Sequence, residues 1–149
     1  MQQQGATMGH DVVTYEEHGE VFNDFDLWTL RYFFIEQAQV MERDMPSDNT
    51  RKLREFFERW DWMCPGVVTG IDFSLYVQGQ RSRWHLLLQL LQATGDRLCL
   101  FGELIPIEFL NPRVSKDGAH FTKPQPVRDY LKSVGRMSTL LSKAEPSIG

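Results

Sequence analysis

Apolar residues between positions 23 and 45 recur at three- and four-residue steps, namely Leu27, Leu30, Phe34, Ala38 and Met41. This spacing places them along one face of an α-helix. Asn23 or Asp24 can cap the start of that helix, and Asp26 falls in its first turn, where the helix dipole favours negative charge. Met45 precedes Pro46, and the residue before a proline is pushed out of the α region. The pattern predicts a long, mostly buried helix that ends near residue 45.

Two more segments show the periodicity of an amphipathic helix. The first follows a cap at Ser47 or Asp48, and its apolar face consists of Leu53, Phe56, Phe57, Trp60 and Met63. The second closes the chain, and its apolar face consists of Val127, Tyr130, Leu131, Val134, Met137 and Leu141. Residues 80–93 leave two alternatives open: a buried strand, or a helix that Ser82 caps and Gly95 terminates. Their leucines and glutamines favour the helix.

Strand signals lie near the N-terminus and in the middle of the chain. Residues 11–23 alternate β-branched or aromatic side chains with polar ones, which predicts a short hairpin. Residues 71–78 alternate in the same way and predict a half-buried strand. Residues 97–110 predict one or two strands interrupted by a glycine and a proline, and the Asp117-Gly118 pair is typical of a hairpin turn.

The 149 residues have the length of one domain, and the predicted elements define its class. Helical segments lie mainly in the N-terminal half and strands in the middle, a segregation that favours α+β over a repeating βαβ pattern. We predict N-terminal helices packed on a small, mainly antiparallel sheet, with a C-terminal helix. Residues 1–9 are expected to form a disordered tail, and residues 10–149 a single α+β domain.

Charge is distributed unevenly along the chain. Residues 1–63 hold 13 acidic and 6 basic residues, a net charge of −7, whereas residues 64–149 hold 7 acidic and 10 basic residues, a net charge of +3. The first thirty residues contain six acids and no base, and five of these acids lie between Glu16 and Asp26. Such a segment attracts basic surfaces and repels nucleic acid and anionic lipid. It can also be no more than a solvated surface, and this alternative stays open.

Residue types that carry enzymatic chemistry do not form a recognised motif in this chain. The four histidines stand apart, without the spacing that a tetrahedral zinc site requires. The sequence has neither a serine nucleophile elbow nor a glycine-rich phosphate loop with its lysine. We therefore expect no enzymatic activity, no cofactor and no metal.

Cysteine usage and hydropathy indicate a cellular compartment. Cys64 and Cys99 lie 35 positions apart, which fits reduced, buried thiols better than a disulfide framework. The N-terminus has no basic and apolar regions of a signal peptide, and no run approaches the roughly 18 apolar residues that span a bilayer. We expect a cytoplasmic protein without a membrane partner.

One short stretch has features of a nucleic-acid contact. Arg81 and Arg83 place two guanidinium groups beside Trp84, whose ring could stack on a base. Two arginines form only a small patch on a chain of net charge −4. We interpret them as ordinary arginines beside a core tryptophan and expect no nucleic-acid partner.

Two aromatic-rich stretches indicate a protein-binding surface, EEHGEVFNDFDLW at residues 16–28 and RWDWM at residues 59–63. Together with the short length, the acidic charge and the lack of a catalytic signature, they give a chain that resembles the bacterial immunity proteins of polymorphic or contact-delivered toxin systems. The resemblance implies stoichiometric binding to a cognate toxin, with acidic residues placed against the basic active-site cleft of the toxin. It also implies that the protein catalyses no reaction of its own.

The sequence therefore predicts a protein-binding inhibitor with its contact surface in the acidic segment. Carboxylates would attract a basic partner at long range, and Phe22, Phe25 or Trp28 would anchor it. The predicted contact residues are Glu16, Glu17, Glu20, Phe22, Asp24, Phe25, Asp26, Asp61 and Trp62. Two alternatives stay open: a phage or host anti-defence or regulatory protein whose carboxylates mimic nucleic-acid phosphates, and a small hydrolase that uses histidine and carboxylate groups.

Overall fold

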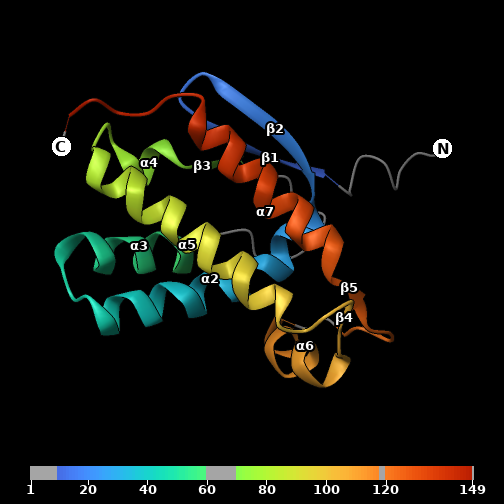
Figure 1. Ribbon diagram of the computed structural model, residues 1–149. Coiled ribbons are helices and arrows are strands. Elements are labelled where there is room, and N and C mark those ends of the chain that lie inside the picture. The colour runs from blue at the N-terminus through green and yellow to red at the C-terminus, as the bar shows by residue number, and fades with distance from the viewer. Residues whose placement is uncertain (1–9, 60–69, 118–119, 149) are drawn as a thin grey trace.

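The computed structural model describes residues 10–59, 70–117 and 120–148, which form an α+β fold (Figure 1). The elements follow one another as β1 (His10–Tyr15), β2 (His18–Asn23), α2 (Asp24–Asp44), α3 (Asp48–Glu58), β3 (Gly70–Asp72), α4 (Ser74–Val77), α5 (Arg81–Cys99), β4 (Leu104–Ile105), α6 (Ile107–Val114), the 3-10 helix η1 (Ser115–Asp117), β5 (Gln125–Pro126) and α7 (Val127–Ser142). The predicted class is confirmed. The predicted order is corrected, because the first hairpin precedes every described helix.

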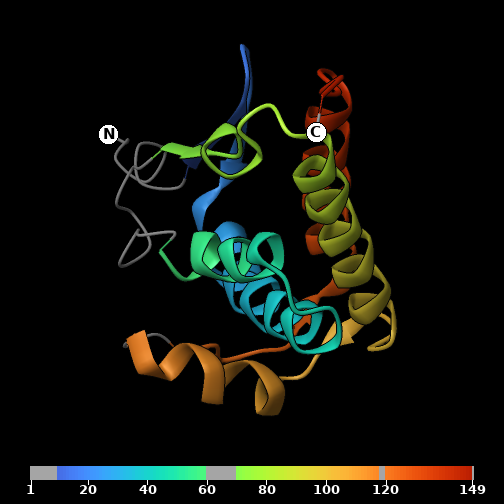
Figure 2. The same ribbon diagram turned by 90° about the vertical axis from the view of Figure 1, so that its left-hand side faces the viewer.

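Helices α5 and α7 pack side by side, and α2 with α3 packs against them (Figure 2). Their apolar faces meet in one core, with fully buried side chains that include Leu30, Phe34, Leu87 and Met137. Helices α5 and α7 are antiparallel, because the segment after α7 returns to the start of α5 (Figure 1). The small sheet lies at one end of the helices and α6 at the other (Figure 2).

The main sheet has the strand order β2-β1-β3, so β2 forms an edge. Strand β1 pairs antiparallel with β2, with Val12 opposite Val21, and parallel with β3, with Val13 beside Ile71. This sheet is mixed, and a second sheet pairs β4 with β5 antiparallel. Successive side chains of a strand point to opposite faces, so Val13 and Phe22 are buried against the helices while Val12 and Val21 point away.

Local capping signals predicted the starts of two helices correctly. The side-chain oxygen of Asn23 accepts hydrogen bonds from the backbone N–H groups of Phe25 (2.9 Å) and Asp26 (3.2 Å), which caps α2. Ser47 and Thr50 exchange side-chain to backbone hydrogen bonds in a capping box at the start of α3. The predicted continuation of α3 past residue 59 lies outside the described residues.

For residues 80–93, the sequence left open a strand or a helix. They form a helix, since α5 begins after its N-cap Gln80 and extends beyond residue 93. This helix continues through Gly95 instead of ending there. An interior glycine costs a helix only about 1 kcal/mol relative to alanine, and burial against α7 offsets that cost. One contact of this packing is the hydrogen bond from Trp84 Nε1–H to the carbonyl of Leu141 (2.9 Å).

The strand predicted at residues 71–78 is wrong beyond Asp72. The carboxylate of Asp72 accepts a hydrogen bond from the N–H of Ser74 (2.9 Å), and the chain turns into α4. Aspartate side chains that bind the backbone two residues on compete with the hydrogen bonds of a sheet. The short helix buries Tyr76 and Val77 and leaves Leu75 exposed, and Phe73 directly before it is also buried.

The strands predicted at residues 97–110 are wrong except for the two residues of β4. Helix α5 runs to Cys99, and α6 starts directly after Pro106, a position where proline loses no helical hydrogen bond. The residues before the predicted turn at Asp117-Gly118 are helical in α6 and η1, so the predicted hairpin arm is also wrong. Gly118 itself lies outside the described residues.

Three remaining expectations concern the tail, the thiols and the membrane. The predicted disordered tail, residues 1–9, and Cys64 lie outside the described residues. Cys99 is a free thiol with an exposed side chain, which corrects the expectation of a buried one. Among the helices that the structure describes, none has the length and the apolar content needed to cross a membrane.

Candidate functional site

The outer face of the β1–β2 hairpin exposes apolar side chains. Val12 and Val21 lie opposite each other across the two strands and are 37% and 52% exposed. Phe25, in the first turn of α2, is 51% exposed. It follows Val21 by four residues, so their Cα atoms are at most about 14 Å apart. We term these three residues, together with Glu16 and Glu17 at the hairpin tip, the hairpin face.

The tip of the hairpin is held in place by a contact with α4. Glu16 and Glu17 form the two-residue turn, and both are exposed. Glu16 has a φ of 54°, in the left-handed region that side chains other than glycine and asparagine seldom adopt. Its N–H donates to Ser74 Oγ (2.8 Å), and the Ser74 hydroxyl donates to Glu16 Oε2 (3.1 Å). The two carboxylates are therefore presented from a fixed turn.

Glu20 is already engaged within the fold. Arg136 of α7 donates from Nη2 to Glu20 Oε1 (2.6 Å) and to the backbone carbonyl of Val21 (2.8 Å). The hydrogen bond from Arg136 holds the pKa of the Glu20 carboxyl below its usual range. Glu20 thus neutralises an arginine that lies 116 positions away, a contact that sequence spacing does not reveal.

Phe22 was expected to be an exposed anchor, and this expectation is wrong. Its side chain is only 1% exposed and lies on the inner face of β2. The guanidinium carbon of Arg136 is 4.3 Å from the centre of its ring. Trp28 is also 1% exposed, so of the three predicted aromatic anchors only Phe25 reaches the surface.

Two carboxylates of the acidic segment are withdrawn from solvent at the start of α2. Asp24 is 1% exposed, and Asp26 is half-buried. Burial raises the pKa of Asp26 to about 6, and the negative charges of Asp129 and Asp24 add to this effect. The expectation that both side chains are solvated is therefore wrong, because the first turn of α2 lies near α7.

The two other predicted contact residues, Asp61 and Trp62, lie outside the described residues. Of the predicted residues that the structure describes, Glu16, Glu17 and Phe25 are exposed. Sequence reasoning missed Val12 and Val21. The alternation of the hairpin places Val12 and Val21 on the face opposite Val13 and Phe22, but only the structure shows that Val13 and Phe22 are the buried pair.

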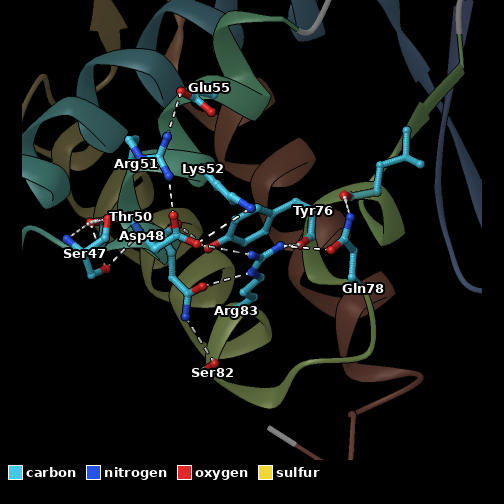
Figure 3. Close-up of polar contacts among 12 residues, drawn as sticks. Ser47, Asp48, Thr50, Arg51, Lys52, Glu55, Tyr76, Gln78, Ser82 and Arg83 are labelled. Carbon is cyan, nitrogen blue, oxygen red and sulfur yellow. Dashed lines mark hydrogen bonds and ion pairs between the residues drawn. The ribbon is translucent and has the colours of Figure 1, made fainter.

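Of the three residues considered as a nucleic-acid contact, Arg83 and Trp84 are buried in the fold, whereas the side chain of Arg81 is 48% exposed. Arg83 is 6% exposed, and its guanidinium donates to Asn49 Oδ1 (3.0 Å), the carbonyl of Tyr76 (3.0 Å) and Gln78 Oε1 (3.2 Å) (Figure 3). The same group lies over the ring of Tyr76, with its carbon 5.4 Å from the ring centre. Trp84 is 7% exposed. Neither side chain is available to contact a nucleic acid.

No cluster of metal-binding side chains is found in the part of the chain that the structure describes. Within residues 10–59, 70–117 and 120–148, no three histidine, cysteine, aspartate or glutamate side chains are placed so that they could hold a metal ion. The carboxyl of Asp26, whose pKa is raised, lies near the carboxylates of Asp24 and Asp129 and near Tyr130. None of these groups is a nucleophile that it could activate. Comparison of the chain with models of protein families, with curated proteins and with solved structures gives no match.

Proposed function

We propose that the protein binds another protein through the hairpin face and, as the resemblance to immunity proteins implies, inhibits a bacterial toxin by forming a stoichiometric complex. The observation that carries the proposal is that the cross-strand neighbours Val12 and Val21 are exposed on one face of a hairpin, which presents Glu16 and Glu17 at its tip and is followed by the exposed Phe25. Single exposed apolar residues are normal on a protein surface, whereas grouped ones rimmed by polar residues mark interaction sites.

The hairpin face suits binding because its framework is fixed before a partner arrives. The tip is bonded to Ser74 of α4, and Arg136 of α7 holds the backbone of β2 at Val21. A surface that is already ordered loses less conformational entropy on association. Phe25 has the aromatic character of residues that contribute most at interface centres.

The carboxylates of Glu16 and Glu17 supply the charge for a basic partner. They are exposed at the end of a hairpin, in a stretch of thirty residues without lysine or arginine. Charges of this kind mainly accelerate the encounter of two proteins and contribute less to the lifetime of the complex. A basic active-site cleft is a surface of the complementary sign.

The alternative of nucleic-acid mimicry finds less support in this geometry. A mimic needs a row of exposed carboxylates that replaces successive phosphates. In the segment from Glu16 to Asp26, Glu20 is paired with Arg136 and Asp24 is buried. Two adjacent carboxylates at a hairpin tip do not form such a row.

The proposal is tested by expressing the product of the neighbouring gene in the source genome with and without this protein. We expect the neighbour to stop growth, this protein to restore growth, and the two to elute together from a sizing column. The combined substitution Val21→Thr and Phe25→Ala should weaken the complex about tenfold, since truncation of interface anchors costs at least about 1 kcal/mol. Titration calorimetry measures the dissociation constant.

A matched control comes from Leu100→Ala, because Leu100 is 85% exposed and lies at the end of α5, away from the hairpin. This variant should bind as the unchanged protein does. Both variants should keep the thermal unfolding transition near its original temperature, since the replaced side chains are at least half exposed. If the two variants bind equally well, the hairpin face is not the binding site, and if no complex forms, the proposed inhibition of the neighbouring gene product is wrong.

Salt should slow the association of this complex through the two tip carboxylates. Exposed charges are screened beyond roughly 8 Å at physiological ionic strength, so the association rate constant should fall as salt rises. Glu16→Gln and Glu17→Gln together should lower the rate at low salt and flatten its dependence on salt. Asp24→Asn should leave this dependence unchanged, because Asp24 is buried. Stopped-flow mixing at several salt concentrations measures the effect, and a flat profile for the unchanged protein contradicts the steering role.

A further inference from the structure

A groove of about 380 Å³ lies between β2 and α7. Strand β2 contributes Glu20, and Lys143 follows directly after α7. Helix α7 itself contributes Lys132, Gly135, Arg136, Thr139 and Leu140. In Figure 1 the strand and the helix lie side by side, and they are in contact. Because Glu20 and Val21 point to opposite sides of β2, the groove and the hairpin face are separate surfaces that adjoin along one strand.

Positive charge dominates the groove. Its lining holds three cationic side chains and one carboxylate. Glu20 is paired with Arg136, and the charge of Lys143 also helps to lower the pKa of the Glu20 carboxyl, whereas Lys132 has no ion pair among the residues that the structure describes. The groove therefore carries an excess of two positive charges on a protein whose net charge is −4. Local charge of this sign concentrates anionic groups even when the whole molecule is acidic.

The spacing of the cations indicates an elongated occupant. Lys143, the residue directly after α7, follows Lys132 by eleven positions, which corresponds to about 16 Å along the direction of the helix axis. This separation suits an occupant longer than a single phosphate. An extended peptide rises about 3.3 Å per residue, so roughly five residues span both lysines.

Gly135 keeps the middle of the groove open. It lies inside α7, has no left-handed φ, and a Cβ added to it would meet no atom within 4 Å. Neither backbone conformation nor packing requires glycine here, although glycine inside a helix is less stable than alanine. The missing side chain leaves space between the cations where a bound chain can approach the helix.

We propose that this groove binds an extended, acidic segment of a partner protein. A peptide is favoured over a nucleic acid because the groove contains a carboxylate and its lining has no aromatic side chain on which a base could stack. The inference is independent of the hairpin face, since the two surfaces share no residue.

The test uses the full chain, labelled with nitrogen-15, and a hexaglutamate peptide as the probe. Backbone amide signals of β2 and α7 should shift on titration, and those of α3 should not. Lys132→Gln with Lys143→Gln should weaken peptide binding about fivefold, as expected for two exposed charge pairs. The matched control, Lys116→Gln with Lys123→Gln, replaces two exposed lysines outside the groove and should bind like the unchanged protein.

A third variant tests whether binding depends on the space in the groove, because it changes that space without changing the charge of the protein. Gly135→Gln should raise the melting temperature, because glutamine favours helix over glycine, and it should weaken binding, because its side chain enters the groove. The proposal is overturned if the peptide gives no shifts, if the shifts lie elsewhere, or if the two lysine pairs behave alike. Tighter binding of a hexathymidylate oligonucleotide at the same signals would also overturn it, in favour of a nucleic-acid site.

Discussion

Replacing Arg83 by methionine should lower the free energy of unfolding by about 3 kcal/mol. The guanidinium is buried and joins α3, α4 and α5 through hydrogen bonds to Asn49, the carbonyl of Tyr76 and Gln78 (Figure 3). Methionine can fill similar space but donates no hydrogen bond, and each buried acceptor left without a donor costs about 1 to 3 kcal/mol. Gln78 has a φ of 49°, so the loss also removes a contact that holds a strained residue. Urea unfolding measures the change.

Arg81→Met provides the control two positions earlier on the same helix. The guanidinium of Arg81 also makes polar contacts, to the carbonyl of Pro146 (3.0 Å) and to Glu145 (3.5 Å), but its side chain is 48% exposed. Exposed pairs of this kind contribute less than about 1 kcal/mol. Similar losses in the two variants would show that the buried network does not carry the stability assigned to it.

The long helices were predictable because their signals are local. Asn23 and Ser47 cap α2 and α3 through hydrogen bonds that span two or three residues. The apolar spacing of α7 defines its buried face in the same way, with Val134 and Met137 in the core. Capping residues and apolar spacing can be recognised from neighbouring residues of the sequence, without knowing the fold.

The errors lie where distant residues or a single side chain decide the structure. The alternation at residues 71–78 is the same for a strand and for a short helix, and the Asp72 carboxylate ends the strand. From the sequence, Glu20 was predicted to be an available surface charge. Its partner Arg136 lies on the last helix and cannot be inferred from neighbouring residues. An acidic segment can therefore be recognised from sequence, but which of its carboxylates remain available depends on tertiary contacts.

The candidate site was predictable in part. Glu16, Glu17 and Phe25 are exposed as expected, because a hairpin turn and the first turn of a helix both lie at the surface. Val12 and Val21 were missed, since the sequence does not reveal which side of a two-stranded ribbon the helices will cover. That choice depends on α7, whose Arg136 packs on the inner face of β2.

The last prediction concerns the dependence of stability on pH. Because the pKa of Asp26 is raised to about 6 in the folded protein, the folded state binds this proton more tightly than the unfolded state does. The contribution of Asp26 to the free energy of unfolding should therefore rise as pH falls from 7 towards 4, the ordinary range of an aspartate. Asp26→Asn, which has no proton to gain, should be more stable than the unchanged protein at pH 8 by about 2 kcal/mol. The expected gain of about 2 kcal/mol is smaller than the full pKa shift implies, because Asp26 is partly exposed and because its charge interacts favourably with the helix dipole.

The groups that face Asp26 make this expectation specific. Asp24 on α2 and Asp129 on α7 add negative charge, and the pKa of the nearby Tyr130 hydroxyl is raised mainly by burial. Asp129→Asn removes one of these charges, so it should lower the pKa of Asp26 and recover part of the stability at pH 8. Urea unfolding between pH 4 and 8 gives the free energies, and the carboxyl carbon signal of Asp26 gives its pKa directly. If Asp26→Asn raises the free energy of unfolding by the same amount at pH 4 and at pH 8, then packing, and not the carboxylate charge, limits stability at the start of α2.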